Sequence, residues 1–337
     1  MRVVITGGTG LIGRALCESL AGDGHEVTVL SRRPDAERKR RLPPGCRLLP
    51  WPALPAAERT LLPGPRPGES DGWRRALEEA EAVVHLAGES IAGGRWNQAR
   101  KERIRGSRVA STRALVEALA AAERRPGVLV SASAVGYYGP RGDEEVTEES
   151  PPGSDFLARV CVAWEREAEV AEGLGLRVVL LRTGLLLAAQ GGALPELVRP
   201  FRLWVGGPLG TGRQWVPWIH LADEVGLIRW ALEEERLRGP LNATAPEPVR
   251  QRELARQLGR VLARPSWLPA PAPLLRLALG EMAEALLLGG QRALPARALA
   301  LGYRFRFPRL EPALRDLLGP RRGRDGPPGE ERYPSGP

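Results

Sequence analysis

The feature that most constrains the fold is a glycine-rich turn between a strand and a helix at the start of the chain. Residues 2–6 (RVVIT) form an almost continuous apolar run, typical of a strand buried on both faces of a parallel sheet. The turn that follows spaces Gly7, Gly10 and Gly13 three residues apart, and a helical pattern covers residues 11–21. This arrangement predicts the first strand–turn–helix unit of a dinucleotide-binding fold.

Each glycine of the turn is expected for a separate physical reason. Gly7 permits the tight turn, Gly10 lets the backbone approach a pyrophosphate, and Gly13 lets the helix pack closely on the sheet. The free N–H groups of the helix N-terminus add a partial positive charge that suits phosphate oxygens. A glycine-rich turn without a ligand is the alternative. We expect phosphate contacts from the whole turn: Gly7, Thr9, Gly10, Leu11, Ile12 and Gly13.

The following segments alternate between strand and helix patterns. Strands are predicted at 26–30, 82–86, 127–131 and 177–182, and helices at 73–79, 97–123 and 156–172. Such alternation predicts an α/β fold with a Rossmann-type, doubly wound parallel sheet. Residues 34–70 are rich in Pro, Arg and Gly and are expected to form an exposed insertion, with a short strand near 46–51.

After residue 187 the alternation stops. Helices are predicted at 221–234, 250–262, 273–288 and 311–318, with a strand at 240–244 and an edge strand at 303–307. We therefore expect a Rossmann domain over residues 1–187 and a smaller C-terminal α/β substrate-capping part over 188–318, with 221–245 returning to the Rossmann domain. The tail, 319–337, has almost no apolar residues and is expected to be disordered.

The composition excludes several classes of function. The 337 residues carry 49 Lys+Arg against 40 Asp+Glu, a net charge of +9, but only Lys39 and Lys101 are lysines. Arginine in place of lysine throughout the chain suggests a coding bias, so we expect no nucleic-acid partner. No apolar run reaches 18 residues, so no membrane span is predicted, and the chain opens directly into a strand rather than a signal peptide.

The cysteines and histidines are equally few. Cys17, Cys46 and Cys161 are isolated thiols, which fits a reducing compartment such as the cytoplasm, and three histidines make a metal site improbable. The expected partner is a small-molecule substrate. The oligomeric state stays open, with a homodimer among the alternatives.

The residues after the second strand indicate which nicotinamide cofactor would bind. In sheets that bind NAD, an acid at this position accepts the ribose hydroxyls. Here the sequence reads Ser31, Arg32, Arg33, with no acid before Asp35. Arginine offers a planar, charged contact to a 2′-phosphate, so Ser31 and Arg32 favour NADP(H). The alternative is that both arginines are solvated surface charges.

The longer motifs TGGTGLIG, VVHLAGESI, SASAVGYYG and LLRTGLLL, with WIHLADEV and GYRFRFP, are similar to those of one family. They resemble the atypical, epimerase-like branch of the extended short-chain dehydrogenases/reductases, NAD-dependent epimerase/dehydratase-like proteins of the 39U type. The resemblance covers residues 1–318 apart from most of 34–70. It implies NADP(H) on the Rossmann domain, under a capping part, with further cofactor contacts from Leu86, Ala87, Gly88, Arg108 and Leu186.

The sequence departs from the superfamily at the catalytic dyad. The family's YxxxK tyrosine and lysine would fall at Phe156 and Val160, which carry neither a phenol nor an ammonium. The remaining catalytic candidates are Ser133, which matches the superfamily's Ser/Thr, and Tyr137 and Tyr138 just beyond it. Each also has a structural interpretation, as a strand-end hydroxyl or a packed aromatic ring.

Other polar and aromatic residues are candidates for the substrate site. Glu89, Trp215 and His220 are expected to line it, although a solvated acid, a core tryptophan and a core histidine are the alternatives. Lys101 could supply a charge or belong to a solvated helix face, and Asp223 is expected to cap the helix that follows it.

The sequence thus predicts an NADP(H)-dependent oxidoreductase or epimerase-like enzyme that acts on a small substrate. Loss of the usual dyad keeps a second hypothesis open, an NADP(H)-binding regulatory or redox-sensing protein without turnover.

Overall fold

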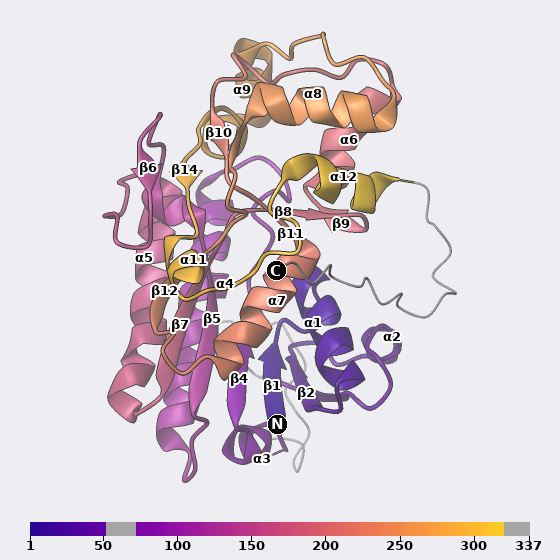
Figure 1. The fold of residues 1–337 in the computed structure, drawn as a ribbon. Coiled ribbons are helices and arrows are strands. Elements are labelled where there is room, and N and C mark those ends of the chain that lie inside the picture. Colours follow the sequence, from indigo (N-terminus) through magenta and orange to yellow (C-terminus); the bar gives the residue numbers. More distant parts are fainter. Residues whose placement is uncertain (52–71, 320–337) are drawn as a thin grey trace, which may run out of the picture.

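The computed structural model describes residues 1–51 and 72–319 (Figure 1). Residues 52–70 of the expected insertion and 320–337 of the predicted disordered tail lie outside these ranges. Within them no helix combines the length and apolarity needed to cross a bilayer, and no three His, Cys, Asp or Glu side chains gather as a metal ion would require.

The centre of the fold is a seven-stranded sheet in which every strand runs parallel to its neighbours. The chain adds strands outward from β1 on one side and then returns to add the rest on the other side, so the order reverses between β1 and β4. In such sheets ligands bind outside the carboxyl ends of the strands, at the reversal point. In spatial order the strands are β12 (Gly239–Ala243), β7 (Arg177–Thr183), β5 (Val128–Ala134), β4 (Ala82–His85), β1 (Arg2–Thr6), β2 (Glu26–Ser31) and β3 (Arg47–Pro50).

Helices cover both faces of this sheet (Figure 1). One face packs on α1 (Leu11–Gly22) and α7 (Leu221–Glu233), and the other on α3 (Gly72–Glu79), α4 (Gln98–Ala121) and α5 (Phe156–Glu169). Alternate strand residues enter the two cores because successive side chains of a strand point to opposite faces. Thus Val3 and Ile5 join the α1–α7 core, while Val4 joins the other.

A second group of helices lies beyond the carboxyl ends of the strands (Figure 1). We call the group of α6 (Leu194–Arg202), α8 (Gln251–Leu262), α9 (Ala272–Leu279), α10 (Glu281–Ala283) and α12 (Leu310–Leu318) the cap. Three of these helices, α6, α8 and α12, enclose their own apolar core.

Short elements join the cap to the sheet. They form three small sheets: β8 (Leu185–Ala188), β9 (Gly191–Gly192) and β11 (Trp218–His220) in the first, β10 (Trp215–Val216) and β13 (Val249–Arg250) in the second, and β14 (Arg292–Ala293) and β6 (Glu145–Val146) in the third. The fold also contains two short helices, α2 (Ala36–Arg40) and α11 (Ala296–Ala300).

Three local predictions are wrong. The single helix expected over 273–288 is divided because Gly280 adopts φ +62°, so α9 ends there and α10 continues into a π-helical turn over Glu284–Leu288. Residues 303–307 form no strand in the described chain. Asp223 does not cap α7, because its carboxylate instead accepts the backbone N–H groups of Arg306 and Phe307, at 2.7 and 2.9 Å, and fixes that segment in place.

Another side chain takes over the capping of α7. His220 Nδ1 accepts the N–H of Ala222 at 3.0 Å, so the histidine is the N-cap. The acid of the first turn that is most deeply buried is Glu224, which is fully inaccessible and accepts the Thr183 hydroxyl at 2.6 Å. Burial raises the pKa of Glu224 to about 8, so the folded protein holds this carboxyl in its neutral form near pH 7.

The stability of the fold should therefore depend on pH through Glu224. The unfolded carboxyl ionises near its usual 4.5, so between about 4.5 and 8 the folded state retains a proton that the unfolded state has lost. Stability falls as pH rises through this window, and it is fully retained only at lower pH. We expect the free energy of unfolding of the wild type, relative to Glu224→Gln, to fall by about 1.4 kcal/mol per pH unit.

The measurement is denaturant unfolding of both proteins from pH 5 to 8, with the exposed Glu18→Gln on α1 as the control. A wild type that tracks Glu224→Gln at every pH would show that Glu224 is already ionised in the folded protein.

Candidate functional site

The glycine turn forms the base of the site, at the carboxyl end of β1. Gly7 has φ +71°, and a Cβ atom there would lie 2.6 Å from the carbonyl oxygen of Leu86. A Cβ on Gly13 would lie 2.4 Å from the carbonyl oxygen of Gly7. The first turn of α1 contains no acid, and Gly10, its N-cap, is exposed. The turn is thus a backbone cradle with a positive helix end, and it fits a pyrophosphate.

The remaining residues of the turn and its surroundings are also in place. Thr9 and Leu11 are half-buried, while Ile12 packs against the sheet core. The side chain of Leu11 lies against Gly192, whose own neighbour is the carbonyl oxygen of Leu186. The structure therefore brings the predicted contacts from the turn after β1 and from β8 close together.

The second strand ends at Ser31, followed directly by Arg32 and Arg33 on the surface. Ser31 Oγ accepts the N–H of Arg33 at 3.3 Å. Within the described ranges neither Arg32 nor Arg33 forms an ion pair, whereas Arg38 is held by Asp35. The two guanidinium groups at the end of β2 are thus available to an anionic ligand.

The loop after β4 packs on a half-buried arginine, Arg108. A Cβ on Gly88 would lie 3.4 Å from Cζ of Arg108, whose guanidinium stacks over the ring of Trp164 at 5.2 Å and donates to the carbonyl oxygen of Ile104 at 3.1 Å. Burial lowers the pKa of Arg108. The Arg108 side chain therefore lies against the Gly88 backbone.

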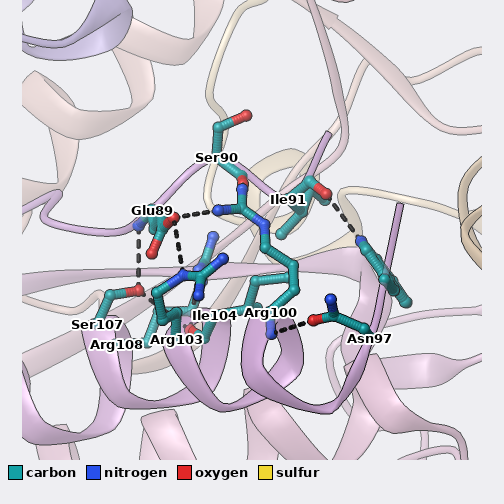
Figure 2. Close-up of polar contacts among 10 residues, drawn as sticks. Glu89, Ser90, Ile91, Asn97, Arg100, Arg103, Ile104, Ser107 and Arg108 are labelled. Carbon is teal, nitrogen blue, oxygen red and sulfur yellow. Dashed lines mark hydrogen bonds and ion pairs between the residues drawn. The ribbon is translucent and has the colours of Figure 1, made fainter. Parts of the chain in front are cut away.

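Glu89 belongs to a tightly bonded loop, shown in Figure 2. The half-buried carboxylate pairs with Arg100 of α4, which also donates to the carbonyl oxygen of Ser90. Ser107 Oγ accepts the N–H of Glu89 at 3.1 Å, and Asn97 caps α4 by accepting the N–H of Arg100 at 2.8 Å. Glu89 thus fixes the loop to α4. The sequence did not indicate that Arg100 would be its partner.

Two of the three catalytic candidates, Ser133 and Tyr138, belong to one buried polar network at the ends of β5 and β7, and the third, Tyr137, packs against it. Ser133 Oγ donates to Glu165 at 2.6 Å, and Arg182 donates twice to the same carboxylate at 2.8 Å. Arg182 also donates to the Tyr138 hydroxyl at 3.0 Å, which donates to Asn242 Oδ1 at 2.7 Å. The hydroxyl groups of Ser133 and Tyr138 are therefore already engaged within the protein.

The charges in this network stabilise each other. Burial alone would lower the pKa of Arg182, but the hydrogen bonds and charge of Glu165 outweigh it and raise that pKa. Burial raises the pKa of the Tyr138 phenol to about 12. Tyr137 differs: its half-buried ring lies under the Arg182 guanidinium, 3.5 Å from ring centroid to Cζ, and no hydrogen bond engages its hydroxyl in the described residues.

The other substrate-lining candidates have structural contacts. Trp215 donates from Nε1 to Asp143 at 2.9 Å, and the guanidinium groups of Arg250 and Arg292 lie 4.2 and 4.9 Å from its ring centroid. His220 is buried. In addition to capping α7, it stacks on Phe307 with its ring centroid 4.0 Å away.

Sequence reasoning missed the acids of the network. Glu165 and Glu148 are both buried, and Glu148 accepts the N–H groups of Asn242 and Arg297 at 3.0 and 3.2 Å. The only sequence signal was a glutamate among the apolar residues of the α5 segment.

Fold and site together define a dinucleotide-binding sheet with a cap, and similarity to known proteins places it more closely. The family model described as "NAD dependent epimerase/dehydratase family" matches residues 3–242, and a domain of unknown function, DUF1731, matches residues 270–317. The chain belongs to the NAD-dependent epimerase/dehydratase family.

Relatives of similar length support this placement. The chain is 42% identical to the "Epimerase family protein SDR39U1 homolog, chloroplastic" of Arabidopsis thaliana, covering 94% of this chain and 87% of the relative. It is 38% identical to the "Epimerase family protein YfhF" of Bacillus subtilis, covering 96% and 99%. A crystal structure of human epimerase family protein SDR39U1 with NADPH has a TM-score of 0.80 at 35% identity, covering 94% and 99%.

The glycine turn yields a direct test. Gly13→Ala would place a methyl group against the backbone of residues 7 and 8, so α1 must shift away from the turn and the phosphate site should be lost. We expect Gly13→Ala to remove the rise in melting temperature that NADPH gives the wild type. Gly22→Ala on the same helix meets nothing within 4 Å and should keep that rise. Equal NADPH stabilisation of both variants would contradict the cradle.

The buried ion pair yields a stability test. Glu165→Gln leaves Arg182 charged in a site where both side chains are only 4% exposed, which typically costs about 3–5 kcal/mol. Glu167→Gln is the matched control, because its Arg113 partner is 58% exposed and such surface pairs contribute about 0–1 kcal/mol. Denaturant unfolding of both variants at one pH measures the difference, and equal losses would show that the buried pair is no stronger than the surface pair.

Proposed function

We propose that the protein is an NADP(H)-dependent oxidoreductase of the epimerase-like class that acts on a small substrate. The observation that carries this proposal is the backbone cradle at Gly7–Gly13 next to a second strand that ends in Arg32 and Arg33 rather than in an acid. The NADPH in the human relative supports the same cofactor.

We assign the residues around the glycine turn to the binding of the cofactor. The glycine turn holds the pyrophosphate, with Thr9, Leu11 and Ile12 beside it, and Arg32 contacts the 2′-phosphate beside Ser31. Leu86, Ala87 and Gly88 border the cofactor at the end of β4, on the support of Arg108, and Leu186 borders it from β8. When bound, the cofactor supplies a hydride. The cap covers the carboxyl edge of the sheet and excludes water from the reacting groups.

Proton transfer needs a group other than the usual dyad. Phe156 and Val160 have no exchangeable side-chain proton, and the hydroxyls of Ser133 and Tyr138 are bonded inside the network. Among the predicted catalytic residues, we assign the proton to the Tyr137 hydroxyl, because Arg182 fixes its ring from one side. Ser133 and Tyr138 then act as positioning residues, by holding Glu165 and Arg182 in place.

The sequence also left open a regulator that binds NADP(H) without turnover, and the absence of the dyad at Phe156 and Val160 favours it. A panel of small aldehydes and ketones separates the two functions. Oxidation of NADPH by any of them, lost in Tyr137→Phe but with NADPH binding retained, supports the enzyme. NADPH binding with no oxidation across the panel supports the regulator.

The choice of cofactor is tested through Arg32. Removing a charged hydrogen bond costs about 1.5–3 kcal/mol, so Arg32→Ser should weaken NADPH binding by about tenfold or more and leave NADH binding unchanged. Arg40→Ser, in the same exposed arginine-rich segment, is the control and should change neither. Titration of cofactor fluorescence measures both affinities. A wild type that binds NADH as tightly as NADPH would contradict the assignment of Arg32.

A further inference from the structure

One lysine joins the two parts of the molecule at the carboxyl edge of the sheet. Lys101 lies in the first turn of α4, the helix that follows β4, and its side chain is 24% exposed. Its ammonium group pairs with the carboxylate of Glu281, the first residue of α10 in the cap. The pair therefore spans from the Rossmann part to the cap at the edge where ligands of such sheets bind.

The lysine lies above an aromatic surface. Its Nζ is 5.2 Å from the ring centroid of Phe156, at the start of α5. The ring of Trp96 meets Phe156 edge-on at a centroid distance of 5.3 Å, and its Nε1 is fixed by the carbonyl oxygen of Ile91 at 2.9 Å. Both rings are half-buried, so each presents part of its surface to solvent next to the ammonium group.

A second cation faces the same point of the cap. The guanidinium of Arg95 lies 3.5 Å from the position that a Cβ on Gly280 would take. Gly280 directly precedes Glu281, so two cations lie at this turn of the cap, and among the described residues Glu281 is the one acid that pairs with either of them. The next acid of the cap, Glu284, pairs with Arg276 instead, at 3.0 Å, and Arg95 has no ion-pair partner in the described ranges.

The positive charge of Lys101 and Arg95 favours an anionic ligand. Two cations with one acid leave an excess of positive charge beside the rings of Phe156 and Trp96. Lysine and arginine form charge-assisted hydrogen bonds to a carboxylate or a phosphate, while the rings can pack on an apolar or cyclic body. Glu281, which is 49% exposed on the cap, can move away from Lys101 without leaving a buried charge.

We propose that Lys101 and Arg95 bind an anionic group of the substrate, a carboxylate or a phosphate, and that Glu281 occupies this position until the substrate enters. The proposal rests on the proposed function in that the ligand is taken to be the substrate, whose cyclic or apolar part packs on Trp96 and Phe156. Substrate binding then replaces the Lys101–Glu281 pair by a pair between Lys101 and the anionic group of the substrate, and it frees α10 from α4.

The two lysines of the chain make the site directly observable. Limited acetylation of the NADPH-saturated protein, followed by mass spectrometry, reports the reactivity of Lys101 against Lys39 as an internal reference. The probes are benzoate, phenyl phosphate and the neutral benzyl alcohol. We expect benzoate or phenyl phosphate to slow acetylation of Lys101 at least fivefold, with no change at Lys39 and none with benzyl alcohol. The two anions distinguish a carboxylate from a phosphate site. No protection by either anion, or equal protection by benzyl alcohol, would overturn the proposal.

Variants distinguish an anion-binding site from an ion pair that only connects α4 to the cap. Glu281→Gln should raise the affinity for the protecting anion about tenfold, because the competing carboxylate is gone, while Glu284→Gln in the same segment should not. Lys101→Met should abolish protein stabilisation by the anion but retain stabilisation by NADPH. If Glu281→Gln weakens anion binding, the pair is only a joint and the proposal fails. Loss of NADPH stabilisation in the wild type would instead contradict the proposed function.

Discussion

The arrangement of the site depends on one buried interaction, the paired hydrogen bonds between Arg182 and Glu165. A charge as deeply buried as Arg182 is tolerable only when a carboxylate neutralises it and its remaining N–H groups find acceptors. Those acceptors are the Tyr138 hydroxyl and the carbonyl oxygen of Glu148, while Ser133 completes the bonding of Glu165. Strands β5 and β7, helix α5 and the loop after β5 are thereby locked together at the edge where the reaction would take place. The same network engages the hydroxyl groups of Ser133 and Tyr138, whereas Tyr137 contacts the guanidinium only through its ring.

The cap is attached to this rigid edge by polar contacts from several elements. Asp223 fixes residues 306 and 307, Asp143 holds Trp215, and Lys101 pairs with Glu281. The first is deeply buried, whereas the acid of the last is half exposed, so the attachments differ in how easily they open. The proposed exchange at Lys101 would therefore leave the buried contact of Asp223, and with it the core of the sheet, in place.

Much of the fold could be predicted from local patterns. Apolar runs and the glycine turn predicted the parallel strands, because a strand buried on both faces needs continuous apolar residues and a close helix needs Gly13. The strand expected at 240–244 joins the sheet as β12 beside β7. The errors arose where a distant side chain decides the local structure. Residues 303–307 look like a strand, but the carboxylate of Asp223 binds their end in place of a neighbouring strand. Gly280 breaks a helix that the apolar period alone would continue.

The sequence by itself determined the phosphate cradle, the excess of arginine after β2 and the absence of the usual catalytic pair, because each is a property of residues adjacent in the chain. Only the tertiary structure decided which polar groups remain available. From the sequence alone, Ser133, Tyr138 and His220 are plausible site residues. In the folded protein, however, the hydroxyl or ring of each contacts a residue from a distant segment. Lys101, conversely, is an ordinary residue of a helix until folding brings Phe156 beneath it and Glu281 of the cap beside it. Hydrogen bonds and ion pairs between distant segments depend on how the helices pack, and the chain order does not record that packing.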